Sequence, residues 1–423
     1  MTRRPRIVIT LGDPCGIGPE LLLGSLAVLD RWAEVVVVGA RAGVDLLLAA
    51  AHPKVAWRWG PANPPEGFAA PPGLQPLGLW TGTEAEPGGY ATWIDPTPEI
   101  TAAQLELGTG SALSGRCAVE AVRLGAEWIL AGKADALVTL PLAKAAAHLA
   151  GYEIPGHTEF LQALAGSPIT RMAFVSPSLM VVLHTVHQSL RSVVEDLSVD
   201  AVAETLAFAA ERFIQLTGKY DLKVALCALN PHAGESGAFG LEETLLDDAL
   251  VQAEAAFMTF DGTGGPFAHV PSPFTSGPAP QGWSLFPRQE EALALMGFRR
   301  DLEVVDLRPA KAPLTQPAPQ FFGPLPADTL FLRASRGEFD LVVALYHDQG
   351  LIPLKVLEPD RAVNLTLGLP FIRTSPDHGT AFDRAGAWSS SATNFLAAAA
   401  LAVKLAGRAK GEPWQAELPG AES

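Results

Sequence analysis

The chain has 423 residues, of which 48% are hydrophobic and 18% charged, and its formal net charge is −15. This length exceeds the needs of one small core and favours two α/β units, and the apolar content argues against general disorder. The acidic balance excludes a broad basic face for nucleic acid, although a few local Lys or Arg side chains suffice to hold one phosphate.

Cysteine usage and the apolar segments bear on the cellular compartment. The chain has three widely spaced cysteines, Cys15, Cys117 and Cys227. They suggest no disulfide framework, which favours a reducing compartment. The apolar run near the start is short and leads into Asp13 and Pro14 rather than a cleavage site, so we interpret it as a strand. The apolar run at 395–403 is too short to span a bilayer. We therefore expect a cytoplasmic protein with no membrane partner.

Apolar runs of strand length recur along the chain, and helical patterns such as those at 112–132 and 199–217 lie between them. The runs are at 6–10, 35–40, 136–140, 179–185, 223–229 and 340–346. Nearly continuous Val, Ile and Leu favour strands that are covered on both faces by helices. The alternation predicts an α/β fold with open, mostly parallel sheets, in which ligands bind beyond the carboxyl ends of the strands.

Two segments fit this alternation poorly. Residues 58–100 are rich in Pro, Gly and Trp, and we expect loops there with a short edge element. Residues 259–322 are also rich in Pro and Gly and are expected to form a large insertion. Segments of this length without regular structure are usually lids, subunit contacts or flexible inserts.

Three histidines each follow one of the predicted strands within a few residues. His187 follows the run at 179–185, His232 the run at 223–229, and His347 the run at 340–346. Each taken alone is better explained as a satisfied loop residue, but three at matching positions predict a site for a divalent metal. We expect the competing His184 to be packed in the interior. Asp348 is either an orienter of an imidazole, a further ligand, or the carboxylate of a turn.

Other polar residues lie in nearby segments. Lys355, Asn364 and Arg373 flank a strand-like stretch soon after His347, where they could clamp a phosphate or carboxylate, although lone basic residues are usually solvated. His157 and Thr158 follow a glycine that permits close approach of a ligand. The alternative for Thr158 is the start of a capping box for the next helix.

Two glycine-bearing loops are candidates for binding a nucleotide. The loop at 11–20 follows the first strand and opens a helix, where backbone N–H groups could meet an anion. The loop at 375–386 is the stronger candidate, because its backbone could approach an adenosine while Asp383 binds a ribose hydroxyl.

With these residues in view, the sequence resembles the 4-hydroxythreonine-4-phosphate dehydrogenase family of vitamin B6 biosynthesis. The resemblance covers residues 10 to 386 and is carried by these blocks: TLGDPCGIGPE, PLAKAA, GHTEFL, HTVHQSLR, NPHAGESG, GPLPADT, YHDQGLIPLK and VNLTLGLPFIRTSPDHGTA.

The resemblance implies a two-lobed α/β/α fold like that of isocitrate and isopropylmalate dehydrogenases, with the active site in the interdomain cleft. We expect one domain at 1–135 plus 370–423 and a second at 136–369, which carries the insertion. It also implies a homodimer whose active site, and its metal, is shared between the subunits.

The resemblance further assigns residues. His187, His232 and His347 correspond to ligands of a divalent metal such as Zn, Co, Mg or Mn. The positions that correspond to substrate binding are His157, Thr158, Lys355, Asn364 and Arg373. The loop that corresponds to cofactor binding comprises His378, Gly379, Thr380, Ala381 and Asp383.

The implied reaction is oxidation and decarboxylation of 4-hydroxythreonine 4-phosphate to 3-amino-2-oxopropyl phosphate. The cofactor is expected to be NAD, since Asp383 would repel a 2′-phosphate, with NADP as the alternative. Lys355 and Asp348 are the catalytic candidates. Lys355 is a base only if burial or a neighbouring cation favours its neutral amine, and metal-bound water or a loop carboxylate remain alternatives.

Rival functions use the same residues. A related dehydrogenase would act on 4-phosphothreonate or 4-phosphoerythronate. A metal-dependent hydrolase would use the histidines to activate water. A ligand-binding protein without activity would have kept the fold alone, and the complete histidine set argues against that.

Overall fold

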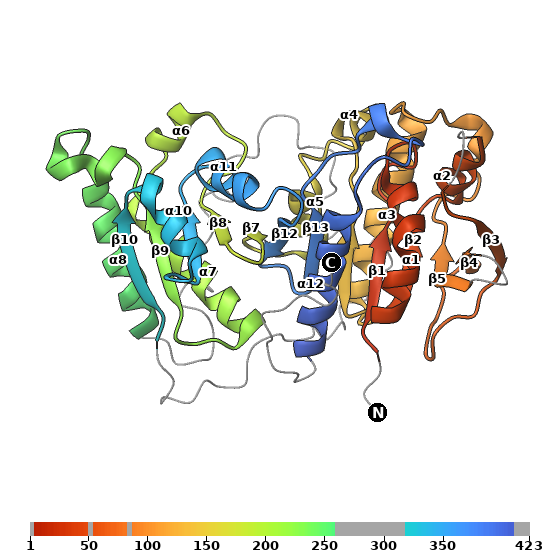
Figure 1. The fold of residues 1–423 in the computed structure, drawn as a ribbon, viewed down its shortest axis with the longest axis horizontal. Coiled ribbons are helices and arrows are strands. Elements are labelled where there is room, and N and C mark those ends of the chain that lie inside the picture. Colours follow the sequence, from red (N-terminus) through yellow and green to blue (C-terminus); the bar gives the residue numbers. More distant parts are fainter. Residues whose placement is uncertain (1–3, 50–53, 83–86, 259–317, 410–423) are drawn as a thin grey trace.

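One mixed β-sheet runs through the computed structural model, which describes residues 4–49, 54–82, 87–258 and 318–409 (Figure 1). Its strands are β1 (Arg6–Thr10), β2 (Glu34–Val38), β3 (Trp57–Pro61), β4 (Leu77–Gly82), β5 (Pro87–Ile94), β6 (Ala136–Thr139), β7 (Arg171–Val175), β8 (Met180–Leu183), β9 (Lys223–Cys227), β10 (Gln320–Leu325), β11 (Leu341–Ala344), β12 (Val363–Leu367) and β13 (Ile372–Pro376). Their order in the sheet is β10-β9-β11-β8-β7-β12-β13-β6-β1-β2-β5-β4-β3. All six apolar runs that we predicted to be strands contribute to this sheet.

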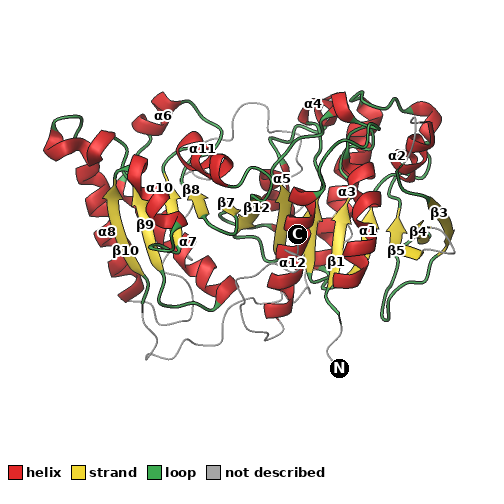
Figure 2. Cartoon of the chain, in the orientation of Figure 1, coloured by secondary structure: helices red, strands yellow, loops and turns green. Residues whose placement is uncertain are grey.

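Helices cover both faces of the sheet (Figure 2). They are α1 (Gly18–Trp32), α2 (Arg41–Leu46), α3 (Ala112–Leu130), α4 (Lys144–Leu149), α5 (His157–Ala165), α6 (Leu190–Glu195), α7 (Val199–Thr217), α8 (Glu242–Met258), α10 (Ala327–Ser335), α11 (His347–Leu357) and α12 (Thr393–Ala409). The two helices predicted at 112–132 and 199–217 are confirmed as α3 and α7. Among the described helices, none combines the length and apolar character that crossing a bilayer requires.

The strands are apolar along their whole length because both of their faces are buried. In β1, Ile7 and Ile9 belong to a core that also contains residues of α1, α7 and α12, whereas Val8 belongs to a core with residues of α3 and α5. Alternate residues of a strand point to opposite faces, so an outward polar residue would here be buried beneath a helix. The predicted α/β class is therefore confirmed, with helices on both sides of a large sheet.

The sheet changes direction near its middle. β12 is antiparallel to both β7 and β13, whereas β13 and β6 are parallel, as are β11 and β8. Strands on the β10 side of this junction come from residues 171–367, and those on the other side come from residues before 140 together with β13. The prediction of mostly parallel pairing holds on both sides of the junction, while the central and edge strands add antiparallel pairs.

Residues 58–100 form more structure than the expected loops with a short edge element. β3 and β4 pair antiparallel, β4 pairs antiparallel with β5, and β5 pairs parallel with β2. Glycines here make room for an aromatic ring rather than mark loops: a Cβ on Gly78 would lie 2.2 Å from the Trp80 ring, and one on Gly60 would lie 2.8 Å from it. The glycine and tryptophan residues that suggested a loop therefore belong to strands β3 and β4 at the edge of the sheet.

The predicted insertion at 259–322 ends earlier than expected. Residues 259–317 lie outside the described residues, and Gln320, Phe321 and Phe322 begin strand β10. β10 pairs parallel with β9, and Phe321 is buried in the core. The two aromatic residues after a Pro-rich run were the sequence signal for this strand.

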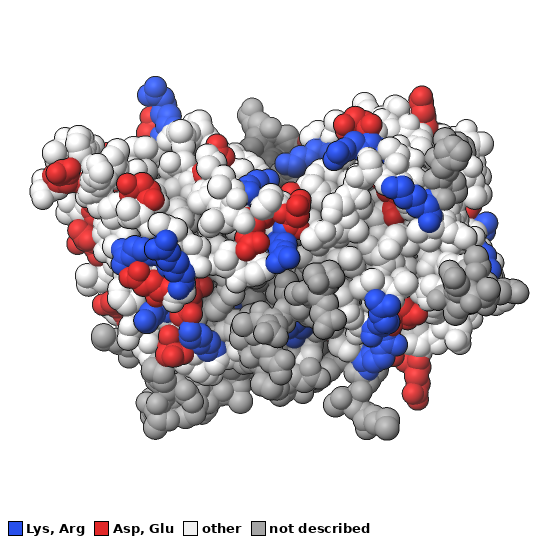
Figure 3. Space-filling model, in the orientation of Figure 1, with Lys and Arg blue, Asp and Glu red and all other residues white. Residues whose placement is uncertain are grey.

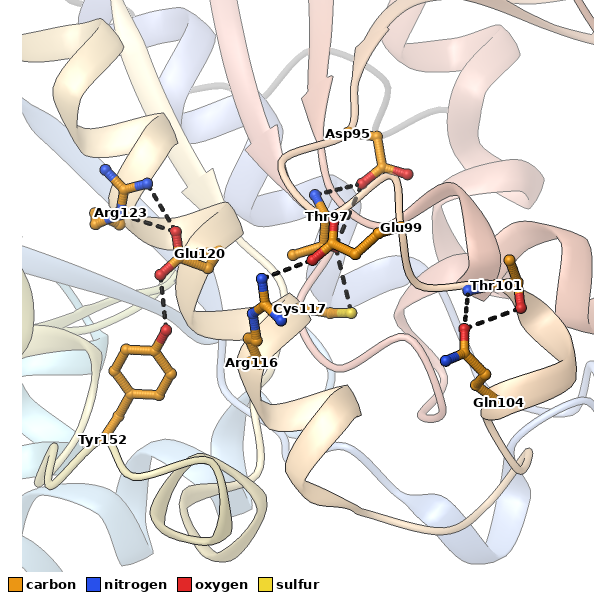
Figure 4. A network of polar contacts seen from close by, with 10 residues as sticks. All are labelled: Asp95, Thr97, Glu99, Thr101, Gln104, Arg116, Cys117, Glu120, Arg123 and Tyr152. Atoms are coloured by element: carbon orange, nitrogen blue, oxygen red, sulfur yellow. Dashed lines mark hydrogen bonds and ion pairs between the residues drawn. The ribbon is translucent and has the colours of Figure 1, made fainter. Parts of the chain in front are cut away.

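A polar network joins α3 to the loops at both of its sides (Figure 4). Arg116 forms an ion pair with Glu99 at 2.6 Å. Glu120 accepts a hydrogen bond from the Tyr152 hydroxyl at 2.7 Å and pairs with Arg123 at 2.7 Å. Tyr152 precedes α5 by a few residues, so this network holds the segment that carries His157 against α3.

Candidate active site

Two of the three predicted metal-binding histidines lie side by side. His187 follows β8 and His347 opens α11 directly after β11, and these two strands are neighbours in the sheet. Their ring centroids are 6.0 Å apart, a separation that suits two imidazoles facing one ion with metal–nitrogen bonds of about 2 Å. The Asp348 carboxylate lies 2.7 Å from His347 Nδ1. This contact fixes the ring and leaves its Nε2 for a ligand, which is the arrangement expected of an orienting carboxylate.

Burial affects the His187 ring. Its pKa is lowered, first by burial and then by the Lys144 ammonium, while the Glu159 carboxylate acts in the opposite direction. A lowered pKa favours the neutral imidazole, which is the form that binds metals.

His232 does not join the other two histidines within the chain. It lies in the turn at Pro231–Gly237, is exposed, and its ring lies 6.3 Å from that of Phe239. Residues 232–236 all have positive φ, a conformation unfavourable for residues other than glycine. Among the described residues, no group of three or more His, Cys, Asp or Glu side chains is placed to hold a metal. A single chain therefore presents a pair of imidazoles, and a three-histidine site needs a further donor.

His184 is packed in the interior, as predicted. Its Nδ1 lies 2.8 Å from the Thr205 hydroxyl. Burial, and to a lesser extent Arg171, lower its pKa to about 3. The ring is therefore neutral and committed to a core contact.

Arg373 is a buried cation that forms no ion pair with a carboxylate among the described residues. Its guanidinium donates to the Thr139 hydroxyl at 2.6 Å and to the Thr366 hydroxyl at 3.0 Å, and the residue is 2% exposed. Burial lowers its pKa to about 10, and the Glu159 carboxylate acts in the opposite direction. A buried charge that is held only by neutral hydroxyls can be stabilised by an anionic ligand.

Two further predicted substrate-binding residues carry buried polar atoms that have no partner in the described part of the chain. These atoms are His157 Nε2 and Asn364 Oδ1. The pKa of His157 lies well below its ordinary value because of burial, then Arg373, then Lys144, so its ring is neutral beside the guanidinium. Asn364 and Thr366 lie two residues apart on β12 and so point to the same face as the Arg373 contact. Buried polar atoms normally have a partner, and a bound ligand would supply one here.

The capping-box interpretation of Thr158 is wrong, because Thr158 is the second residue of α5 and not its N-cap. α5 begins at His157, its N-cap is Gly156, and no side chain caps it. A glycine cap leaves the first N–H groups of the helix open to an external acceptor.

Lys355 is already paired with a carboxylate. It lies on α11, its side chain is 52% exposed, and its Nζ is 3.0 Å from an oxygen of Asp377. The catalytic role of Lys355 therefore stays a prediction, and the structure adds its ion pair with Asp377. The ion pair links α11 to the residues that follow β13.

The predicted cofactor loop is held against the first glycine-rich loop. Ile17 donates its backbone N–H to the Thr380 carbonyl at 3.0 Å, and a Cβ on Gly16 would lie 2.8 Å from that oxygen. Ala381 has a φ of 43°. His378 Nε2 is buried without a partner, whereas Gly379 and Asp383 are exposed. The two loops thus form one surface, as their glycines allow.

Comparison with known proteins assigns the chain to a family. The family model for the pyridoxal phosphate biosynthetic protein PdxA matches residues 82–268 and 302–402. The chain belongs to the PdxA family. The resemblance inferred from the sequence blocks is thereby confirmed.

Relatives of the PdxA chain span nearly its whole length. The 4-hydroxythreonine-4-phosphate dehydrogenase of Desulfosudis oleivorans is 33% identical over 95% of this chain and 96% of its own. The D-threonate 4-phosphate dehydrogenase of Salmonella typhimurium is 32% identical over 95% of this chain and 98% of its own. The crystal structure of 4-hydroxythreonine-4-phosphate dehydrogenase from Klebsiella pneumoniae has a TM-score of 0.63 at 29% identity and covers 95% of this chain and 98% of its own.

The sequence reasoning missed several residues of this PdxA site. Lys144 and Glu159 act on the pKa of His187, and Thr139 and Thr366 hold Arg373. Lys144 stands inside the block PLAKAA and Glu159 lies two residues after His157, so their places beside recognised residues were the available signal. The threonines gave none, because a hydroxyl within a buried strand looks like any other core residue.

Charge on the face shown in Figure 3 is mixed. Acidic and basic side chains are interspersed there, and no broad basic patch covers this face. This pattern suits a site that holds a small anion by a few local groups.

Proposed function

We propose that this PdxA protein is a metal-dependent, NAD-linked dehydrogenase that oxidises and decarboxylates 4-hydroxythreonine 4-phosphate. The products are 3-amino-2-oxopropyl phosphate, CO2 and reduced NAD, so the two electrons lost by the carbinol carbon reduce the cofactor. The observation that carries the proposal is the group of residues around Arg373: a buried cation together with His157 Nε2 and Asn364 Oδ1, two buried atoms that have no partner among the described residues.

Arg373 and His157 supply the phosphate-binding end of the site. Arg373 offers a positive charge that is held by threonine hydroxyls and, in the described part of the chain, by no ion pair with a carboxylate. His157 in its neutral form can donate one hydrogen bond without adding charge, and Asn364 and Thr158 offer further polar contacts. A phosphate monoester carries almost two negative charges at neutral pH, so its affinity should depend mainly on the cationic groups.

His187 and His347 are the residues that would hold the metal, together with a third histidine. A bound divalent ion such as Zn, Co, Mg or Mn supplies Lewis-acid polarisation of the substrate oxygens. Asp348 orients His347 through Nδ1, so it acts as a positioning residue. Lys355 and Asp377 position α11 against the strand end that follows Arg373.

His378, Gly379, Thr380, Ala381 and Asp383 form the cofactor surface in this proposal. The unpartnered Nε2 of His378 is available for a hydrogen bond to the cofactor. The exposed Asp383 carboxylate can accept from a ribose hydroxyl and would repel a 2′-phosphate, which favours NAD over NADP.

Homodimerisation with a shared site is part of the proposal. α6 begins three residues after His187 and exposes Leu190 and Val194, and α11 begins at His347 and exposes Ile352 and Val356. Apolar side chains gathered beside a binding site are typical of subunit interfaces. A second subunit would also supply the donor that the single chain lacks.

The two-lobed architecture and the location are inferred as well. The antiparallel junction at β12 and β13 divides the strands as two lobes would, with domains at 1–135 plus 370–423 and 136–369 and the site in a cleft between them. Three buried free cysteines suit a reducing cytoplasm.

A second candidate substrate is 4-phosphothreonate, because a relative named D-threonate 4-phosphate dehydrogenase is about as similar as the others. The two substrates share the phosphate, the carbinol and the carboxylate. They differ at the carbon between the carbinol and the carboxylate, which bears an amino group in one and a hydroxyl group in the other. Every residue assigned above addresses the shared groups.

A single assay tests the proposal. The protein is supplied with each substrate, NAD or NADP and a divalent metal, and formation of reduced cofactor and of CO2 is followed with and without chelator. We expect chelator-sensitive reduction of NAD with one CO2 released for each NAD reduced. Product without cofactor reduction would instead indicate the hydrolase.

A further inference from the structure

Lys144 is a basic residue near the site to which the proposed function assigns no ligand contact. It is the first residue of α4, its side chain is exposed, and among the described residues it forms no ion pair. A Cβ on Gly156 would lie 3.8 Å from Lys144 Nζ and 3.0 Å from Glu159 Oε2. The ammonium and the carboxylate thus lie over the same backbone segment, where α5 begins.

Lys144 and Glu159 lie next to the group formed by Arg373 and His157. Both approach Gly156, which directly precedes His157 at the start of α5. In agreement with this placement, the Lys144 charge contributes to the lowered pKa of His157, and the Glu159 carboxylate acts on the pKa of Arg373. Two cations and one carboxylate therefore lie near the proposed phosphate-binding group.

A phosphate bound at this group would need a second cation of the protein to balance its charge. Arg373 offsets one of the nearly two charges of a phosphate monoester, and Glu159 opposes the ligand. Lys355 is committed to Asp377. Lys144 remains as a flexible point charge next to the pocket, and lysine is well suited to bind phosphate in that way.

Helix stability gives no reason for a lysine at this position. The N-terminal turn of a helix carries a partial positive charge, so a cation there is unfavourable. Lys144 lies in that turn, and no side chain caps α4. Its removal should leave the fold intact, which allows its effect on binding to be measured.

We propose that Lys144 is a substrate-binding residue whose Nζ contacts the phosphate held by Arg373 and His157 and offsets the Glu159 carboxylate. This inference rests on the proposed function, in which that pocket receives the substrate phosphate. Lys144 thereby sets the preference of the site for a doubly charged group over a singly charged one.

Calorimetric titration of the full-length protein with inorganic phosphate tests the inference. For Lys144→Met we expect Kd for phosphate to rise about tenfold, as for a lost charge-assisted contact, and for Lys144→Arg we expect nearly wild-type affinity. Glu159→Gln should tighten binding and partly restore it in the Lys144→Met background. Lys223→Met is the matched control, because Lys223 is exposed at the start of β9, the end of that strand away from His232.

Thermal unfolding without phosphate checks that the variants are folded, and Arg373→Met separates the two claims. Wild-type phosphate affinity in a folded Lys144→Met variant, with binding lost in Arg373→Met, would overturn the role of Lys144 alone. Unchanged affinity in both variants would also contradict the proposed phosphate pocket. In turnover, loss of Lys144 should raise KM more than it lowers kcat.

Discussion

At the scale of single residues, the site is marked by buried polar groups that lack a hydrogen-bond or ion-pair partner among the described residues. Within the described residues, Arg373 has hydroxyl partners but no ion pair, and His157 and Asn364 each bury an atom without a partner. Such groups are costly in a core and are retained where they serve a ligand. These three residues could be predicted from the sequence. Their lack of partners could not, because it depends on which strands and helices become neighbours in the fold.

Arg373→Met should separate binding from stability. The variant removes a buried cation while keeping most of the side-chain volume, so we expect the free energy of unfolding to rise by about 1 kcal/mol. Phosphate binding should be lost in the same protein. Urea denaturation and calorimetry measure the two effects, and a strongly destabilised variant would show that the guanidinium is structural instead.

His184 predicts a specific pH dependence of stability. Burial, then Arg171, lower its pKa to about 3, so between the ordinary value of 6.5 and about 3 the unfolded chain binds a proton that the folded chain does not. Above pH 6.5 His184 has no effect on the free energy of unfolding. As pH falls from 6.5 towards about 3, that free energy decreases, because protonation stabilises only the unfolded chain. In His184→Gln the free energy of unfolding should fall less steeply between pH 6 and pH 4, by up to about 1.4 kcal/mol per pH unit. Parallel curves for the two proteins would contradict this account of His184.

At the scale of elements, the loops after the strands do most to build the site. The turn after β1 and the segment after β13 touch through Ile17 and Thr380, although these residues are far apart in sequence. The sequence showed two glycine-rich loops and gave no sign that they meet. It likewise could not show that Lys355 pairs with Asp377, because an ion pair between a helix and a distant strand end leaves no local pattern.

Gly16→Ala tests the joined loops, with Gly24→Ala as its control. A Cβ at Gly16 would press on the Thr380 carbonyl at 2.8 Å, whereas one at Gly24 of α1 meets nothing within 4 Å. We expect Gly16→Ala to weaken NAD binding about tenfold or more by displacing the cofactor loop. Gly24→Ala should bind NAD normally and be stabilised by about 0.5–1 kcal/mol. NAD affinity is measured by fluorescence titration. Equal affinities of the Gly16→Ala and Gly24→Ala variants would contradict a role of the loop at 378–381 in cofactor binding.

At the scale of the whole molecule, the sequence was most informative about the strands and least about what one chain lacks. Continuous apolar runs predicted six strands because burial on both faces demands such composition. The aromatic edge of β3, β4 and β5 escaped prediction because its glycines accommodate Trp80 and so look like loop residues. The separation of His232 from the other two histidines depends on tertiary, and in our proposal quaternary, structure that no spacing reveals.

In the proposed function, three histidines from two subunits form the site at which NAD-linked oxidation occurs. Single Ala variants at His187, His232 and His347 are each expected to be inactive and to lose bound metal. When two inactive variants are mixed and allowed to exchange subunits, half of the dimers become mixed. A mixed dimer has one intact site only if the two altered histidines belong to different subunits within a site.

The most direct measurement is therefore the NAD-reducing activity of the three pairwise mixtures of these variants after subunit exchange. We predict that two of the three mixtures recover roughly a quarter of the wild-type activity, with metal content rising in parallel, and that the third stays inactive. The inactive mixture identifies the two histidines that come from the same subunit. Inactivity of all three mixtures, in dimers shown to have exchanged, would contradict a shared site.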